Sequence, residues 1–158
     1  MCGIIGYTGS EPALPFLLEG LKRLEYRGYD SAGTALCGHN RLQWWKTAGK
    51  VQALAELLPD PAPNGVCGAH TRWATHGVPS VENAHPHLDA AGRIAVVHNG
   101  IIENYAPLRQ TLEAAGYRFA SDTDSEVIAH LIAGQPPAIR RRRWRQHCGC
   151  SGEPGASQ

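Results

Sequence analysis

Residues 2–9, CGIIGYTG, place a cysteine directly behind the initiator methionine and at the start of a short apolar run. The run is closed by glycine, which is typical of a buried β-strand. We expect Met1 to be removed because the residue after it is small, so that Cys2 carries a thiol and a free α-amino group. A thiol ordinarily has a pKa near 8.5 and an α-amine one of about 7.7 to 8.0, so the amine can accept the thiol proton. Most cysteines are simply small buried residues, but this position favours a nucleophile with its own base.

The composition bounds the class of protein. With 158 residues the chain is long enough for one domain with a core, and its formal charge of +1 gives no indication of a nucleic-acid or membrane partner. No apolar stretch approaches the length of a bilayer span, and the N-terminus lacks the features of a signal peptide. The five cysteines have no regular spacing, which indicates thiols in a reducing compartment. We therefore expect a cytoplasmic protein.

The pattern of apolar residues predicts strands and helices that come in pairs. Strands are expected at residues 2–9, 31–38, 41–49, 66–74, 93–100 and 117–121, and helices at 12–26, 50–58, 102–116 and 122–133. Asp122 or Thr123 is the expected N-cap of the last helix. Residues 75–92 have little periodicity and are interpreted as a substrate-binding loop. Because the elements do not strictly alternate, the pattern favours an α+β layered sandwich over a doubly wound parallel sheet.

The composition changes at about residue 134. Residues 134–158 are dominated by Arg, Gly, Pro and Cys, so we predict an unstructured tail that cannot bury a core. The arginine run at 140–145 suggests either a nucleic-acid patch or a solvated tail, and we favour the tail. Residues 147–150, HCGC, supply only half of the ligands that a structural zinc site requires.

Six segments resemble, in order and spacing, the N-terminal glutaminase domain of the glucosamine-6-phosphate synthases, which are class II glutamine amidotransferases. They are CGIIG (2–6), LEYRGYDSAG (24–33), HTRWATHG (70–77), NAHPH (83–87), VVHNGIIENY (96–105) and SDTDSEVIAHL (121–131). Other class II amidotransferases share the N-terminal cysteine and the Asn-Gly pair, but not this combination. The resemblance covers residues 1–133 and implies an N-terminal nucleophile (Ntn) hydrolase-type αββα sandwich, incomplete at its C-terminus.

The resemblance implies that Cys2 attacks the side-chain amide of L-glutamine, which releases ammonia and leaves a γ-glutamyl thioester that water hydrolyses. It implies that the side chain of Asn99 and the backbone N–H of Gly100 form the oxyanion hole. An Asn-Gly pair by itself more often marks a turn. Arg72 is expected to bind the α-carboxylate of glutamine and Asp124 its α-ammonium group. Without the resemblance these two would be interpreted as a surface charge and a helix-start acid.

The resemblance also assigns substrate-binding residues to a loop that closes over glutamine: Trp73, Thr75, His76 and Gly77. Trp73 is further implied in the passage of ammonia, although by itself it would be interpreted as a core aromatic. Four histidines suggest a zinc site: His76, His85, His87 and His98. Their spacing fits no familiar pattern, and the resemblance implies neither a metal nor a cofactor.

In this family the glutaminase domain continues beyond residue 133 and is followed by two isomerase domains that bind fructose 6-phosphate for amino-sugar biosynthesis. Full-length members form homo-oligomers. None of those domains is in this sequence, and the change near residue 134 suggests a reading-frame shift or a fragmentary gene, with a natural regulatory tail as the alternative. We expect an enzyme by family whose glutaminase activity in this chain is weak or absent and stops at glutamate and ammonia. The alternative is an inactive fragment that only binds glutamine or associates with an intact synthase.

Overall fold

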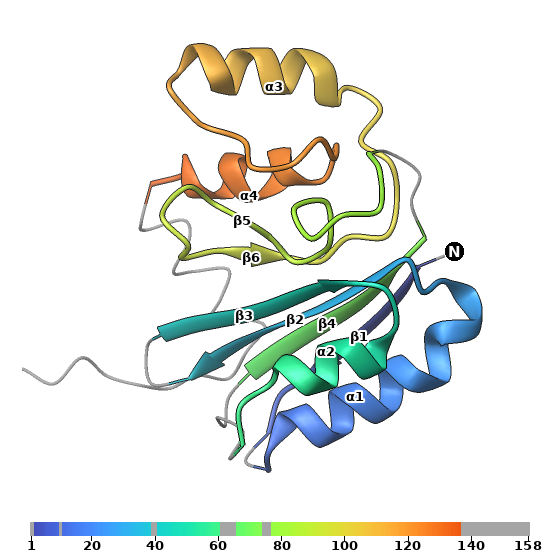
Figure 1. The fold of residues 1–158 in the computed structure, drawn as a ribbon. Coiled ribbons are helices and arrows are strands. Elements are labelled where there is room, and N and C mark those ends of the chain that lie inside the picture. Colours follow the sequence, from blue (N-terminus) through green and yellow to red (C-terminus); the bar gives the residue numbers. More distant parts are fainter. Residues whose placement is uncertain (1, 10, 39–40, 61–65, 74–76, 137–158) are drawn as a thin grey trace, which may run out of the picture.

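The computed structural model describes residues 2–9, 11–38, 41–60, 66–73 and 77–136 (Figure 1). Two sheets face each other at the centre, and helices cover the outer face of each sheet. The helices α1 (Ala13–Leu24) and α2 (Val51–Leu57) lie on the larger sheet. On the smaller sheet lies α4 (Glu126–Ala133), with α3 (Tyr105–Ala114) packed on α4. This αββα arrangement confirms the predicted α+β class.

The larger sheet has four antiparallel strands in the order β1-β4-β2-β3. They are β1 (Gly3–Tyr7), β2 (Ser31–Gly38), β3 (Arg41–Ala48) and β4 (Val66–Arg72). Gly3, at the start of β1, pairs with Thr71 near the end of β4. Because the strands run in opposite directions, this register brings Cys2 beside the residues that follow Thr71.

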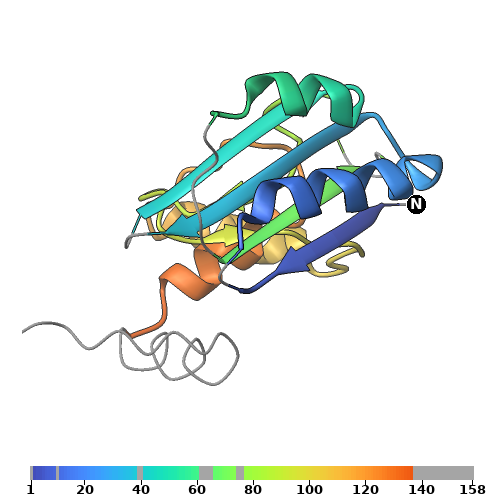
Figure 2. The same cartoon turned by 90° about the horizontal axis from the view of Figure 1, so that it is seen from below.

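The core of this layer lies between the larger sheet and its helices, which run along the strands in Figure 2. Leu14, Leu17 and Leu21 recur at helical spacing along α1 and are buried against the sheet. Each such leucine stabilises the fold by roughly 1.5 to 3 kcal/mol. The short helix η1 (Glu25–Arg27) follows α1, and the Glu25 carboxylate accepts the backbone N–H of Val51 at 2.7 Å. This contact fixes the start of α2.

The smaller sheet pairs β5 (His87–Leu88) with β6 (Ala95–Val96). The turn between them is held by Asp89, whose Oδ1 accepts the backbone N–H groups of Arg93 at 2.6 Å and Ile94 at 2.8 Å. Within the described ranges, no helix is long and apolar enough to span a bilayer.

Three sequence predictions about this second layer are wrong. The segment 117–121 forms no strand, because the Glu126 carboxylate accepts the backbone N–H groups of Ala120 and Ser121 in place of a neighbouring strand. The N-cap of α4 is Ser125, while the hydroxyl of Thr123 contacts His87. The predicted loop 75–92 contains the strand β5. The predicted tail lies outside the described residues from position 137 onward.

Gly33 in β2 lies where the two layers touch. A Cβ atom at this position would overlap the carbonyl oxygen of His85 and lie 3.0 Å from the carbonyl oxygen of Trp45. Both obstacles are backbone atoms, so relief would require a shift of a strand or of the neighbouring layer. The absence of a side chain at Gly33 therefore sets how closely the two layers pack.

We expect Gly33→Ala to lower the free energy of unfolding by about 3 kcal/mol, because the added methyl group forces the layers apart. Gly68→Ala is the matched control. It lies in the neighbouring strand, and its Cβ would make only an ordinary contact of 3.7 Å with Val97 Cγ2. Urea unfolding followed by tryptophan fluorescence measures both variants. Equal losses would show that the layers tolerate a side chain at Gly33.

Candidate functional site

A pocket of about 100 Å³ lies where the starts of β1 and α4, the end of β4 and the loop after β6 meet. Six residues that the sequence predicts for the site line this pocket: Cys2, Arg72, Trp73, Asn99, Gly100 and Asp124. The fold thus brings together residues from four separate segments. Gly77 contacts Arg72 outside the lining, and the predicted Thr75 and His76 lie outside the described residues.

The thiol of Cys2 is half-buried and lies against the end of β4. Its Sγ accepts the backbone N–H of Trp73 at 3.4 Å and lies 3.7 Å from the carbonyl oxygen of that residue. Asn99 Nδ2 donates to the carbonyl oxygen of Cys2 at 3.4 Å. The strand register therefore positions the thiol, and the Asn99 amide lies next to the same residue.

Arg72 is the last residue of β4 and is only 4% exposed. Its Nη2 donates to the carbonyl oxygen of Gly77 at 3.2 Å. Gly77 has a φ of 75°, which favours glycine, and a Cβ there would lie 2.6 Å from Asn83 Nδ2. A guanidinium can bind both oxygens of a carboxylate through two parallel hydrogen bonds.

Asp124 lies just before α4 and is also only 4% exposed. Its Oδ2 accepts the backbone N–H of Ile102 at 2.6 Å, and its Oδ1 accepts the hydroxyl of Ser125 at 3.3 Å. One buried carboxylate and one buried guanidinium thus line a single small pocket. This pair of charges complements an α-amino acid, which carries an ammonium and a carboxylate group.

Three buried histidines are in ring contact at the pocket, and one of them, His85, lines it. The ring centroids of His70 and His85 lie 4.0 Å apart, and those of His85 and His87 lie 4.3 Å apart. Burial lowers the pKa of His70 to about 4 and that of His87 to about 3, and it lowers the pKa of His85 further. All three imidazoles are therefore neutral at pH 7. In the part of the chain that the structure describes, no group of His, Cys, Asp or Glu is placed to hold a metal ion.

Sequence reasoning assigned no place in the substrate pocket to five residues that line it: His85, His98, Ile101, Thr123 and Ser125. It considered His85 and His98 only as zinc ligands and Thr123 only as a helix N-cap. Each lies within or beside a segment that carries the resemblance, such as NAHPH or SDTDSE. His98 and Ser125 could have been predicted as pocket residues because they are the sequence neighbours of Asn99 and Asp124.

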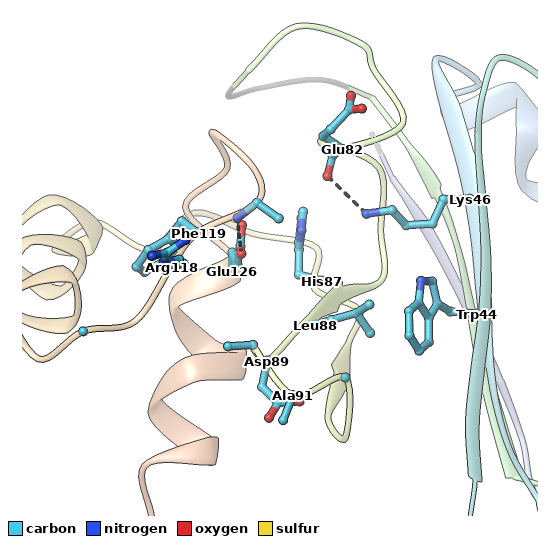
Figure 3. A pocket seen from close by; sticks show the side chains of 14 residues that line it. Trp44, Lys46, Glu82, His87, Leu88, Asp89, Ala91, Arg118, Phe119 and Glu126 are labelled. Carbon is cyan, nitrogen blue, oxygen red and sulfur yellow. Dashed lines mark hydrogen bonds between the residues drawn. The ribbon is translucent and has the colours of Figure 1, made fainter.

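A second, larger pocket of about 650 Å³ shares none of these residues (Figure 3). It lies between β3 and the second layer. Lys46 Nζ donates to the backbone oxygen of Glu82 at 3.1 Å on its rim. Burial lowers the pKa of Lys46, while the carboxylates of Glu126 and Glu82 oppose that change.

The family profile described as "Glutamine amidotransferase domain" matches residues 70–148. The chain is 59% identical over 135 residues to the glutamine–fructose-6-phosphate aminotransferase (isomerizing) of Gloeobacter violaceus. It is 58% identical over 135 residues to the protein of the same name from Streptomyces coelicolor. Each alignment covers 84% of this chain but 22% of the relative, so the chain spans about a fifth of the length of these relatives.

Among solved structures, the chain is similar to the glutamine phosphoribosylpyrophosphate amidotransferase of B. subtilis, with a TM-score of 0.74 and 27% identity. The superposition covers 90% of this chain and 31% of that chain. A structure of an allosteric regulatory enzyme of purine biosynthesis gives a TM-score of 0.75 at 27% identity. The fold is thus of the Ntn-hydrolase type found in these amidotransferases. With its sequence matches and the arrangement of its pocket, this chain belongs to the glutamine amidotransferase domain family.

Proposed function

We propose that this chain hydrolyses L-glutamine to L-glutamate and ammonia, with Cys2 as the nucleophile. The observation that carries the proposal is the single pocket in which Cys2, Asn99 and Gly100 lie with Arg72 and Asp124. The guanidinium binds the α-carboxylate of glutamine and the carboxylate of Asp124 binds its α-ammonium group. The side-chain amide then reaches toward Cys2.

In the proposed reaction, removal of Met1 frees the α-amine of Cys2 as the base. The amine takes the thiol proton, directly or through one water, and Sγ forms a bond to the amide carbon of glutamine. Asn99 Nδ2 and the N–H of Gly100 donate to the oxygen that becomes negative. The C–N bond breaks as the leaving nitrogen takes up a proton, and water then cleaves the thioester to release glutamate.

Trp73, Thr75, His76 and Gly77 are proposed to close over bound glutamine. Trp73 is 55% exposed at the mouth of the pocket, and Gly77 contacts Arg72 through its carbonyl oxygen. Closure holds glutamine against Cys2 while the thioester forms, and water must enter the site again to hydrolyse it.

We further propose that residues 1–133 are the glutaminase part of a cytoplasmic glucosamine-6-phosphate synthase and that residues 134–158 are a tail, although the match to the family profile continues to residue 148. The names of the relatives support the assignment to such a synthase. In such an enzyme the ammonia is transferred to fructose 6-phosphate bound by other domains, and the full-length chains associate as homo-oligomers. The proposed chemistry of Cys2 uses neither a metal nor a cofactor.

Glutamate release by the purified chain, measured with an enzyme-coupled assay, tests the proposal. We expect hydrolysis of L-glutamine that does not respond to fructose 6-phosphate. Binding of glutamine without release of glutamate would instead favour a domain that only binds glutamine or associates with an intact synthase.

We expect Asp124→Asn to raise KM for glutamine by about 10- to 100-fold with a smaller effect on kcat, because the ammonium group loses its charged partner. Asparagine keeps an oxygen that can accept the N–H of Ile102, so the local backbone stays in place. Glu103→Gln is the control, since Glu103 is a nearby exposed acid that does not line the pocket. Steady-state kinetics measures both variants. A KM for Asp124→Asn equal to that of the control would contradict the assigned contact.

A further inference from the structure

A chain of hydrogen bonds connects His98 to Asp124 through Ser125, and all three residues line the pocket. The hydroxyl of Ser125, which is 3% exposed, lies 2.9 Å from His98 Nδ1 and donates to Asp124 Oδ1 at 3.3 Å. A hydroxyl has one proton, and an ionised carboxylate has none to give. His98 Nδ1 must therefore be the donor to Ser125, which leaves Nε2 of the neutral ring without a proton.

The segment 98–102 is attached at both ends to residues 124 and 125. His98 reaches Ser125 at one end, and the N–H of Ile102 donates to Asp124 at the other. Between these attachments lie Asn99 and Gly100. The ring of His98 also packs on Gly100, where an added Cβ would lie 2.9 Å from Nε2. The position of His98 therefore constrains the backbone of Gly100.

The Ser125 hydroxyl does not cap the start of α4. Ser125 precedes the first residue of α4, but its backbone is already helical, with φ −70° and ψ −22°, and does not have the extended conformation in which a serine caps a helix. Its side chain makes no capping hydrogen bond in this structure. The hydroxyl is therefore available to join His98 to Asp124, and all three residues line the pocket.

We propose that His98 and Ser125 are positioning residues that hold the Asn99–Gly100 donors at a fixed place relative to Asp124. The inference rests on the proposed function. Glutamine contacts Asp124 at its ammonium end and the oxyanion donors at its amide end, so a fixed separation aligns the amide carbon with Cys2.

Steady-state glutamine hydrolysis tests the role of each residue. We expect Ser125→Ala and His98→Gln to lower kcat/KM by about 30-fold, with most of the loss in kcat, because the donors shift from the developing oxyanion. His98→Asn should recover most of that loss, since its Nδ2 can occupy the place of Nδ1. Thr111→Ala is the matched control, because it removes an exposed hydroxyl that bonds only within α3. Thermal unfolding of every variant separates loss of folded protein from loss of rate.

The ring nitrogen of His98 that carries the proton can be identified by NMR, and this measurement does not depend on catalytic activity. In ¹⁵N–¹H correlation spectra of the wild-type chain, neutral His98 should carry its proton on Nδ1, and Ser125→Ala should favour the Nε2–H form. A proton on Nε2 in the wild type would overturn the inference, as would equal rates for His98→Asn and His98→Gln. An active wild type with an unimpaired Ser125→Ala refutes this inference alone. A wild type without glutamate release refutes the proposed function and the inference together.

Discussion

Replacing Cys2 by alanine is expected to reduce glutamate release by more than about 10⁴-fold, because no other group in the pocket can form the thioester. Glutamine should still bind, since Arg72 and Asp124 contact the other end of the substrate. Coupled kinetics measures the loss of kcat, and isothermal titration calorimetry measures the retained affinity.

Cys67→Ala is the control for this experiment. Cys67 is buried in β4, and burial raises its pKa to about 11, so its thiol stays protonated and unreactive. A diazoketone analogue of L-glutamine should alkylate Cys2 and leave Cys67 unmodified in intact-mass and peptide-mass spectra. Equal labelling of the two cysteines, or full activity in a protein that retains Met1, would contradict the mechanism.

Lowering the pH from 7 to 5 is expected to reduce the free energy of unfolding by about 4 kcal/mol through His70 and His87 alone. Their pKa values are about 4 and about 3 in the folded chain, against an ordinary value of 6.5. Between pH 6.5 and the folded pKa, the unfolded chain binds more protons than the folded one. Stability therefore falls as the pH drops through this range, and His85 adds to the loss in the same direction.

Urea unfolding at pH 7 and pH 5 measures this effect. His87→Gln is the informative variant, because glutamine does not titrate but can retain a hydrogen bond to the hydroxyl of Thr123, which lies 2.9 Å from His87 Nε2. It should reduce the difference between the two pH values by about 2 kcal/mol. Identical unfolding free energies for the wild type at both pH values would show that the histidines are not neutral in the fold.

The first layer could be predicted closely from sequence because its elements have strong local patterns. The leucine spacing of α1 determines its buried face, and the strands expected at 2–9 and 66–74 match β1 and β4 within a few residues. The expected burial of the first strand is wrong, because β1 lies at the edge of the sheet and Ile4 is 41% exposed. The second layer depends on contacts between distant residues. Glu126 takes the backbone N–H groups of the segment 117–121, and no local pattern indicates that choice.

In the candidate site, too, some features could be predicted from local sequence and others depend on contacts between distant residues. The Cys2 chemistry can be inferred from one position in the sequence, but the grouping of Arg72, Asn99 and Asp124 was expected only from the resemblance. The link from His98 through Ser125 was not predicted, because the partner of a serine hydroxyl is decided by the tertiary fold. The spacing of residues along the chain does not indicate that Ser125 contacts His98.

The two layers are formed by separate, consecutive parts of the chain, so the residues of the site are synthesised at different times. All strands of the larger sheet lie within residues 3–72, whereas the smaller sheet and its helices lie within residues 87–133. A growing chain emerges from the ribosome N-terminus first, so Cys2 and Arg72 are synthesised before Asn99, Gly100 and Asp124. The nascent first layer therefore holds the proposed nucleophile without the proposed oxyanion donors. Under the proposed mechanism, the thiol can form no stabilised thioester intermediate until the second layer is made and docked.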